Sequence, residues 1–288
     1  MSTVMSAPSA TPSAALAPRQ FAAIAAIMQA EARIHLAPSK VTLIESRLAR
    51  RVREHGLASF ADYVALVESD PAERGEMVAS LTTNHTHFFR EAHHFDHVRD
   101  TLSPALRERA ARRERVRLWS AGCSSGEEVY TLAMVLLGHG RSAAKWALEG
   151  DVRLLASDLS PPVVAAVACG EYADSVIEPV PPAYRDRWLE RSASGWRVRD
   201  ELRALVTPRV LNLFGDWPMR GNFDAIFCRN VMIYFEKPSQ AELQQRLAAQ
   251  LRPGGFLYIG HSERLMGPAE ALFERCGQTI YRKRAGAA

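Results

Sequence analysis

The run RVRLWSAGCSSGEE, from Arg115 to Glu128, decides the fold. Its apolar residues between 116 and 119 predict a short buried strand, and the apolar run VYTLAMVLL that follows predicts a helix ending at Leu137. Between strand and helix, Gly122 and Gly126 supply the backbone freedom that a tight turn requires. This order of strand, glycine turn and helix is typical of a nucleotide-binding corner in an α/β protein, although such turns also occur without a ligand.

Two carboxylates open the predicted helix, at Glu127 and Glu128. They repel a phosphate and favour a cationic or amine-bearing ligand, so the sulfonium and amino groups of S-adenosylmethionine fit better than a pyrophosphate. A second predicted strand, 152–157, leads into Asp158, and a carboxylate at this place in dinucleotide folds accepts hydrogen bonds from both ribose hydroxyls. Capping of the helix that follows is the alternative role for Asp158.

The composition is that of an ordinary globular enzyme, with 288 residues, 47% hydrophobic and 24% charged. The net charge of +4 and the separate clusters of arginines do not indicate a dedicated nucleic-acid binder. The four cysteines are isolated from one another, which argues against a zinc site or a disulfide framework and favours a reducing compartment. Neither a membrane span nor a signal peptide is apparent, so we expect a cytoplasmic location.

The pattern along the chain predicts several regions. Residues 1–19 are rich in Ala, Ser, Pro and Thr and predict a disordered tail. Residues 20–90 show apolar residues at helical spacing and predict an all-α domain, followed by a linker helix over 91–114. Residues 115–288 predict an α/β domain, interrupted at about 170–206 by a hairpin or small β-subdomain that we expect to contact a partner or substrate.

A basic stretch lies on the second predicted helix, away from its apolar face, with Arg47, Arg50, Arg51 and Arg53. Charge runs of this kind are usually solvated faces. A docking surface for an acidic helical partner is the second interpretation, and binding of nucleic acid is a more distant third.

A histidine-rich segment, LTTNHTHFFREAHHF, ends the predicted helical domain. His93 and His97 have the spacing of two metal ligands on a helix, but no third ligand follows at a suitable distance, so we expect no metal site. Asn84, Thr86 and Arg90 form a polar edge within this aromatic-rich segment. Such an edge suits a segment that closes over a ligand, and an interdomain helix is the alternative.

Further polar side chains follow predicted strands. Asn212 lies in a predicted strand, 210–213, from which it can hydrogen-bond an adenine edge. A buried strand, 225–228, leads into Arg229 and Asn230, with Tyr234 close behind. Because ligands of α/β folds bind at the carboxyl ends of parallel strands, we expect Arg229, Asn230 and Tyr234 to face the site.

Taken together, these motifs resemble the CheR-type chemotaxis receptor methyltransferases, which are S-adenosylmethionine-dependent protein-glutamate O-methyltransferases. The resemblance covers the chain from about residue 20 and rests on LTTNxTxFFREAHHF, SAGCSSGEE, ASD, FDAIFCRNVMIYF, LRPGG and GHSE. It implies an all-α N-terminal domain whose basic helix docks on the methylated helices of a receptor. It also implies a Rossmann-like methyltransferase domain with a small β-subdomain insertion.

The resemblance further implies roles for single residues. Contacts with the cofactor are implied for Asn84, Thr86, Arg90, Glu128, Asp158, Asn212, Leu213, Arg229 and Asn230. Arg90 and Tyr234 are implied to lie nearest the transferred methyl group, and Arg47, Arg50, Arg51 and Arg53 to form the docking surface. The expected partner is the cytoplasmic helical region of a methyl-accepting chemotaxis receptor, met by a monomer, with no part for nucleic acid or membrane insertion.

The implied reaction needs little from the protein beyond alignment. A glutamate side chain with a pKa near 4.3 is already a carboxylate nucleophile at neutral pH, and the methyl group on a sulfonium is already activated. Alignment for in-line displacement and exclusion of water are worth about 7–11 kcal/mol. The remaining hypotheses are a methyltransferase for another substrate and a signalling adaptor that binds the cofactor or S-adenosylhomocysteine without turnover.

One departure from the family pattern concerns the β-subdomain. The predicted hairpin turn from Ser192 to Gly195 is short compared with members whose subdomain binds a tethering pentapeptide at a receptor C-terminus. We therefore expect that this chain does not bind such a tether.

Overall fold

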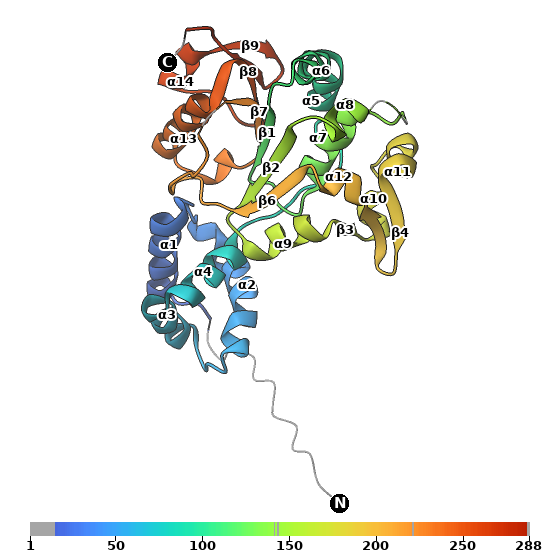
Figure 1. The fold of residues 1–288 in the computed structure, drawn as a ribbon. Coiled ribbons are helices and arrows are strands. Elements are labelled where there is room, and N and C mark those ends of the chain that lie inside the picture. The colour runs from blue at the N-terminus through green and yellow to red at the C-terminus, as the bar shows by residue number, and fades with distance from the viewer. Residues whose placement is uncertain (1–14, 141, 143, 221, 287–288) are drawn as a thin grey trace, which may run out of the picture. The chain divides into compact units, whose positions relative to one another are not determined.

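The computed structural model describes residues 15–140, 142, 144–220 and 222–286 (Figure 1). The chain forms two compact units, Met1–Thr83 and Asn84–Ala288. Most of the predicted disordered tail lies outside the described residues. The rest of it is ordered, because Leu16 is buried, its N–H donates to the Glu45 carboxylate at 2.6 Å, and the first helix already begins at Pro18.

The described part of the first unit is built from helices. They are α1 (Pro18–Ala32), the short η1 (Pro38–Lys40), α2 (Val41–Glu54), α3 (Phe60–Ser69) and α4 (Pro71–Leu81). Local sequence explains their ends: the Ser59 hydroxyl accepts the N–H of Asp62 at the start of α3, and the Asp70 carboxylate accepts the N–H of Ala72 at the start of α4. The predicted all-α character of this unit is confirmed.

A buried carboxylate joins three of these helices. Glu73 of α4 accepts hydrogen bonds from the Arg51 guanidinium of α2 and, at 2.6 Å, from the Tyr63 hydroxyl of α3, and it faces His55 Nε2 at 2.7 Å. Burial alone would raise the pKa of Glu73, but these hydrogen bonds, led by that of Arg51, lower it. Arg51 therefore holds the interior of the first unit together.

The second unit is organised around a seven-stranded sheet with strand order β6-β2-β1-β7-β8-β10-β9. Among the described strands of this sheet, β10 alone runs in the direction opposite to the others. The strands are β1 (Val116–Ala121), β2 (Val152–Asp158), β6 (Val206–Val210), β7 (Phe223–Cys228), β8 (Leu251–Ile259), β9 (Phe273–Gly277) and β10 (Ile280–Lys283). The predicted α/β fold is confirmed.

Helices cover this sheet and set the place of the site. They are α5 (Ala92–His97), the π-helical turn η2 (Val98–Leu102), α6 (Ser103–Ala111), α7 (Glu127–Leu137), α8 (Lys145–Leu148), α9 (Pro161–Cys169), η3 (Met232–Tyr234), α13 (Lys237–Gln250) and α14 (Pro268–Leu272). The connections from β1 through α7 to β2 and from β2 through α9 to β6 move toward one edge of the sheet. The connection from β7 through α13 to β8 moves toward the other edge. Since parallel crossovers are right-handed, α13 covers the face opposite to α7 and α9 (Figure 1).

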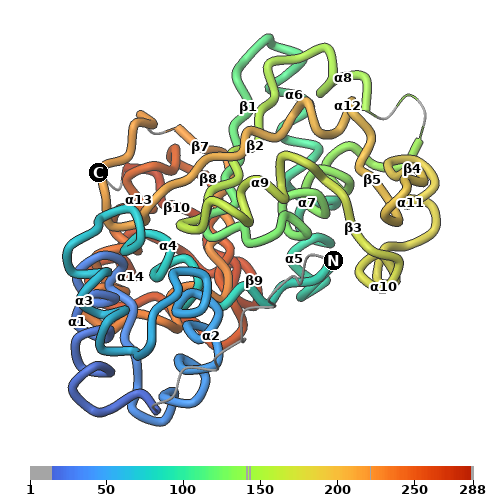
Figure 2. Tube along the Cα trace, turned by 90° about the horizontal axis from the view of Figure 1, so that it is seen from below, coloured from blue at the N-terminus to red at the C-terminus, as the bar shows by residue number. Residues whose placement is uncertain are grey.

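A small antiparallel sheet forms the inserted subdomain between α9 and β6, to one side of the large sheet (Figure 2). Its strand order is β3-β5-β4, with β3 (Glu171–Tyr172), β4 (Leu189–Ser192), β5 (Gly195–Val198), α10 (Asp174–Ile177), α11 (Pro182–Trp188) and α12 (Asp200–Arg203). Ser192 pairs with Gly195, so the hairpin closes over two residues. The absence of tether binding stays a prediction.

The boundary between the units differs from the predicted one. It falls after Thr83, so residues 84–90 do not belong to the helical domain, and 91–114 is not a linker between domains. The reason is apolar burial: Phe95, Val98 and Leu102 belong to the core of the second unit. A helix with such a stripe needs a hydrophobic surface to pack against, and the α/β core supplies it.

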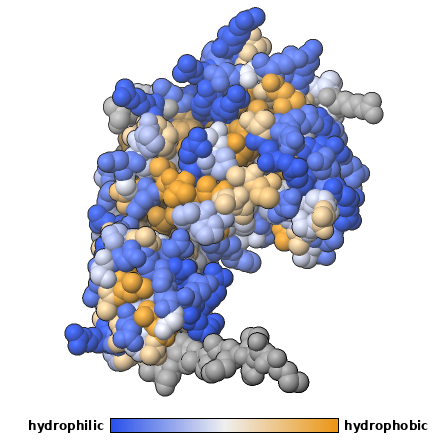
Figure 3. Space-filling model, turned by 60° about the horizontal axis from the view of Figure 1, so that its bottom comes forward, coloured by the Kyte–Doolittle hydropathy of each residue, from blue (hydrophilic) through white to orange (hydrophobic). Residues whose placement is uncertain are grey.

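Hydrophilic residues cover most of the face shown in Figure 3, with apolar patches between them. The large apolar side chains that stay exposed include Leu148, Val210 and Ile233 of the second unit. Within the ranges described above, no helix is both long enough and apolar enough to cross a membrane.

The Glu73 cluster generates a prediction for stability. We expect Glu73→Gln to lower the free energy of unfolding by about 3 kcal/mol, because the amide removes the buried counter-charge of the Arg51 guanidinium and leaves it only the more exposed Glu54 carboxylate. Denaturant titration followed by circular dichroism measures this change. As a control, Glu68→Gln on the exposed side of α3 should change stability by less than about 0.5 kcal/mol. Equal losses in the two variants would contradict the role of Glu73.

The same cluster sets a dependence on pH. The pKa of Glu73 is lowered from 4.5, so its stabilising contribution is fully present above that pH and is lost as the pH falls below it. The stability difference between wild type and Glu73→Gln should therefore shrink in acid.

Candidate active site

The carboxyl ends of β1 and β7 lie side by side where the direction of the crossovers reverses. The two strands pair up to Ser120 and Phe227, close to their last residues. Beyond β1 the chain enters the glycine turn, and beyond β7 it enters Arg229 and Asn230. Ligands of open α/β sheets bind at such a reversal point.

The two glycines of the turn are required by conformation and by space. Gly122 has φ 76° and Gly126 has φ 101°, values that other residues rarely adopt. A Cβ on Gly122 would lie 2.5 Å from a methyl carbon of Val231, and one on Gly126 would lie 2.8 Å from the Tyr172 hydroxyl. The turn therefore keeps its backbone close to the strand ends.

Asp158, the last residue of β2, holds this turn in place. Its carboxylate accepts the N–H of Ser124 at 2.9 Å and the N–H of Ser160 at 3.0 Å. The Ser124 hydroxyl in turn donates to the carbonyl oxygen of Asn84 at 3.0 Å. Burial raises the pKa of Asp158, and the backbone hydrogen bonds oppose that rise. The structure thus brings Asp158, the glycine turn and the segment of Asn84 together.

The adjacent carboxylates of Glu127 and Glu128 have different partners. Glu128 accepts hydrogen bonds from the Ser120 hydroxyl at 2.7 Å and from Arg229 Nη1 at 3.1 Å. Glu127 is buried and accepts from the hydroxyl of Ser125 beside it. Burial raises the pKa of both carboxylates, and the guanidinium opposes that rise at Glu128. Contact with Arg229 therefore distinguishes two residues that sequence alone leaves equivalent.

The Arg229 side chain is enclosed by protein. It is 1% exposed, and besides Glu128 it reaches the carbonyl oxygen of Arg90, the Glu91 carboxylate at 3.5 Å and the Phe95 ring, whose centroid lies 5.5 Å away. We expected this side chain to face a ligand. Its guanidinium instead faces protein groups, since a buried charge is stable only when it is paired.

Asn230 has a left-handed backbone, with φ 59°, and Glu263 holds it there. The Glu263 carboxylate accepts the N–H groups of Asn230 at 3.1 Å, Met232 at 2.8 Å and Gly260 at 2.6 Å. Gly260 leaves room for this approach, because a Cβ there would lie 2.5 Å from the Asn230 side chain. Glu263 is not among the residues predicted from the sequence, and its signal there is the GHSE motif directly after a buried strand.

The other predicted residues on this side of the sheet follow strand ends. Strand β6 ends at Val210, so Asn212 lies beyond the strand and not within it as predicted. Its Oδ1 accepts the N–H of Phe214 at 2.9 Å, which fixes a turn around the buried Leu213. Tyr234 is half-buried in η3.

The polar edge of the histidine-rich segment is more open. Asn84 is exposed, and Thr86 and Arg90 are half-buried. Arg90 Nη1 donates to the carbonyl oxygen of His85 at 2.8 Å, which folds the side chain back over its own loop. The surrounding residues bury little of this edge, so it can meet a ligand.

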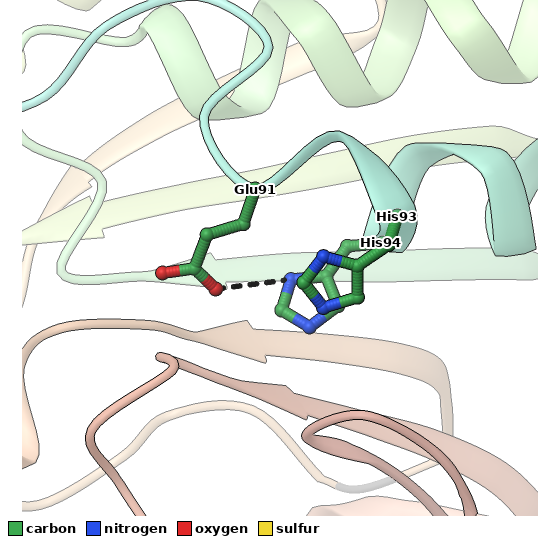
Figure 4. Close-up of side chains that lie close together, drawn as sticks. All are labelled: Glu91, His93 and His94. Atoms are coloured by element: carbon green, nitrogen blue, oxygen red, sulfur yellow. Dashed lines mark ion pairs between the residues drawn. The ribbon is translucent and has the colours of Figure 1, made fainter.

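Glu91, His93 and His94 place three possible metal-ligating atoms within 4.8 Å of one another (Figure 4). His94 already uses Nε2 on the Thr279 hydroxyl at 2.9 Å. The Arg229 guanidinium, 3.5 Å from Glu91, supplies a positive charge that opposes a second cation. The expected absence of a metal site stays a prediction.

The groups at the strand ends fit S-adenosylmethionine. Glu128 and Asp158 offer acceptors and negative charge for an amino group, ribose hydroxyls and a sulfonium. An acidic residue after β2 beside a glycine turn after β1 is the pattern of nucleoside-cofactor folds. Fold and site together define a Rossmann-like, S-adenosylmethionine-dependent methyltransferase.

Comparisons with known proteins give the particular family. A family model described as CheR methyltransferase, SAM binding domain, matches residues 84–282, and a second, CheR methyltransferase, all-alpha domain, matches residues 19–82. The chain belongs to the CheR methyltransferase family. The two matched segments meet where the structure divides into its two units.

Named relatives agree with this assignment. A probable chemotaxis protein methyltransferase of Rhizobium etli is 44% identical over 262 residues, which cover 89% of this chain and 96% of the relative. Chemotaxis protein methyltransferase 2 of Pseudomonas aeruginosa is 41% identical, with 86% and 87% covered. The chemotaxis protein methyltransferase of Escherichia coli is 38% identical, with 93% and 91% covered.

The Asp158 geometry generates a prediction for binding. We expect Asp158→Ala to weaken S-adenosylmethionine binding roughly 100-fold, because the ribose loses its acceptor and the glycine turn loses its anchor. Isothermal calorimetry on the purified protein measures the Kd. Asp186→Ala on the surface of α11 is the matched control and should leave the Kd within about twofold. Unchanged affinity in the Asp158 variant would remove this residue from the site.

Proposed function

We propose that this protein transfers the methyl group of S-adenosylmethionine to glutamate side chains in the cytoplasmic helical region of methyl-accepting chemotaxis receptors. The products are a glutamyl methyl ester and S-adenosylhomocysteine, and the proposed setting is adaptation in chemotaxis. The observation that carries the proposal is membership of the CheR family across both units of the chain, together with curated relatives named chemotaxis protein methyltransferases.

The proposed mechanism relies on binding and orientation. The cofactor supplies a methyl group already activated by the sulfonium. Glu128 holds the amino group of its methionine part, and Asp158 accepts the ribose hydroxyls. Arg90 pairs with and orients the incoming glutamate carboxylate or the cofactor carboxylate, and Tyr234 lines the path of the methyl group. The acceptor glutamate is ionised at neutral pH, so no side chain has to remove a proton.

Asn84, Thr86, Asn212, Leu213 and Asn230 complete the proposed cofactor contacts. Support for this set comes from their positions: Asn212 and Leu213 follow β6, Asn230 follows β7, and Asn84 and Thr86 belong to the segment tied to the glycine turn. Arg229 takes a supporting part in the proposal, because its buried guanidinium pairs with Glu128.

The proposed docking surface is narrower than the four arginines first considered. Arg47 donates to the carbonyl oxygens of Leu81 at 2.8 Å and Thr82 at 2.9 Å, so it caps the C-terminal end of α4. Arg51 is hydrogen-bonded to the buried carboxylate of Glu73. The Arg50 side chain is 74% exposed, and Arg53 is exposed as well. We assign docking on the acidic receptor helices to Arg50 and Arg53.

One experiment tests the reaction. The protein is incubated with S-adenosylmethionine labelled in the methyl group and with a receptor cytoplasmic fragment, and the labelled receptor is then treated with mild base. We expect the label to be released as methanol, because a glutamyl methyl ester is base-labile. A base-stable label would indicate a methyltransferase for another acceptor group. No transfer to any receptor by a protein that binds the cofactor would indicate an adaptor.

A second experiment tests docking. We expect the double variant Arg50→Ala, Arg53→Ala to raise the KM for the receptor fragment about tenfold, since each lost surface contact is worth up to about 1 kcal/mol. The Kd for S-adenosylmethionine should stay unchanged. Arg112 and Arg113, which are exposed in the second unit, provide a control double variant of equal charge. Equal rises in KM for both double variants would show a general effect of net charge.

A further inference from the structure

The turn that carries Arg90 has an uncommon backbone. Phe89 and Glu91, on either side of it, both have φ 58°. Residues other than glycine seldom adopt this left-handed conformation, and they keep it only where the surroundings hold it. The position of Arg90 therefore depends on what anchors its two neighbours.

Phe89 is anchored by the helix α7 and by aromatic packing. Its N–H donates to the Thr131 hydroxyl at 3.2 Å. Its ring lies against Phe95, with centroids 6.0 Å apart, and against Tyr184, with centroids 5.6 Å apart. These contacts hold the first half of the turn.

Glu91 is anchored through its carboxylate. Oε1 accepts the backbone N–H of His261 at 3.3 Å and faces its Nδ1 at 3.0 Å, and Oε2 lies 3.5 Å from Arg229 Nη2. The side chain is only 11% exposed. Burial alone would raise the pKa of Glu91, but Arg229 and His261 outweigh burial and lower it. The second half of the turn is thus held by a charged group.

His94 does not donate a hydrogen bond to the Glu91 carboxylate. The Thr279 hydroxyl donates its hydrogen to the carbonyl oxygen of Gln278 at 2.8 Å, so it accepts the Nε2–H of His94 at 2.9 Å. Nδ1 of the neutral ring then presents a lone pair to Glu91 Oε2, 3.6 Å away, and has no hydrogen-bond partner (Figure 4). Two acceptors cannot bond, so Arg229 supplies the attraction on Oε2.

Arg229 links Glu91 to Glu128 and to the backbone of Arg90. The same guanidinium that faces Glu91 donates to the carbonyl oxygen of Arg90 and, at 3.1 Å, to Glu128. Without the charge of Glu91, it is free to shift toward Glu128. The hydrogen bond on the Arg90 backbone would then weaken, and the turn would lose a support on each side.

We propose that Glu91 is a positioning residue for methyl transfer, whose carboxylate, held between Arg229 and His261, sets the place of the Arg90 turn. This role rests on the proposed function, and on the acceptor glutamate as the carboxylate that Arg90 orients there. Glu91 acts through its neighbours and does not itself touch the acceptor or the cofactor.

The variant Glu91→Gln tests this role, because it preserves shape and removes charge. We expect its kcat on a receptor fragment to fall about 10- to 100-fold, the effect of misplacing a reacting group by about 1 Å, while the Kd for S-adenosylmethionine stays within about threefold. A kcat within twofold of wild type would overturn the proposal. So would a rise in Kd as large as the fall in kcat, since that would place the effect of Glu91 on cofactor binding and not on methyl transfer.

Further variants separate positioning from folding. Glu91→Asp keeps the charge and should recover most of the lost kcat, and His261→Ala, at a side chain that is 59% exposed, should lower kcat about threefold. Glu242→Gln on the exposed side of α13 is the matched control and should keep full activity. If Glu91→Asp is as impaired as Glu91→Gln, charge is not the determinant and the proposal fails.

A measurement without any acceptor keeps this test independent of the receptor. Hydrogen exchange in the peptide spanning residues 84–91 should be at least tenfold faster in Glu91→Gln than in wild type, with melting temperatures that show both proteins folded. Unchanged exchange would overturn the proposal, whatever the acceptor is. Failure of wild type to form a base-labile ester would instead count against the proposed function, and the exchange result would still decide the role of Glu91.

Discussion

The site depends on one buried guanidinium. Arg229 follows the last residue of β7 and pairs with Glu128 from the start of α7 and with Glu91 from the Arg90 turn. Three segments far apart in sequence are joined because a buried charge without partners is costly, and two carboxylates surround the one guanidinium. Loss of any one member changes the charge balance of the other two.

Glycine positions make this arrangement possible. Gly122, directly after β1, packs against Val231, and Gly260, directly after β8, packs against Asn230, because neither glycine has a side chain in the way. Glu263 holds Asn230 in a left-handed conformation. Strand ends that would otherwise be kept apart by side chains therefore meet at the reversal point of the sheet. The polar groups that follow each strand converge there because parallel strands all end at the same edge.

The first unit shows a comparable use of a buried carboxylate. Glu73 draws Arg51, Tyr63 and His55 into the interior, so the basic helix α2 has an inner and an outer set of arginines. Arg47 and Arg51 stabilise the unit, and Arg50 and Arg53 stay exposed. A helix with basic residues on several sides is thus fixed in one orientation, with a defined outward face.

Patterns along the sequence predicted the features that depend on residues close together in the chain. The bounds of α7, the glycine turn and the acidic end of β2 were all evident, because apolar periodicity and glycine preference are local properties. Contacts between distant segments decided the rest. Several features exist only once the chain is folded. They are the burial of the Arg229 guanidinium, the hydrogen bonds of Glu263 to the loop after β7, the separate partners of Glu127 and Glu128, and the packing of α5 and α6 with the sheet. Burial and charge pairing are set by which residues meet in space, and that is what the sequence by itself left undecided.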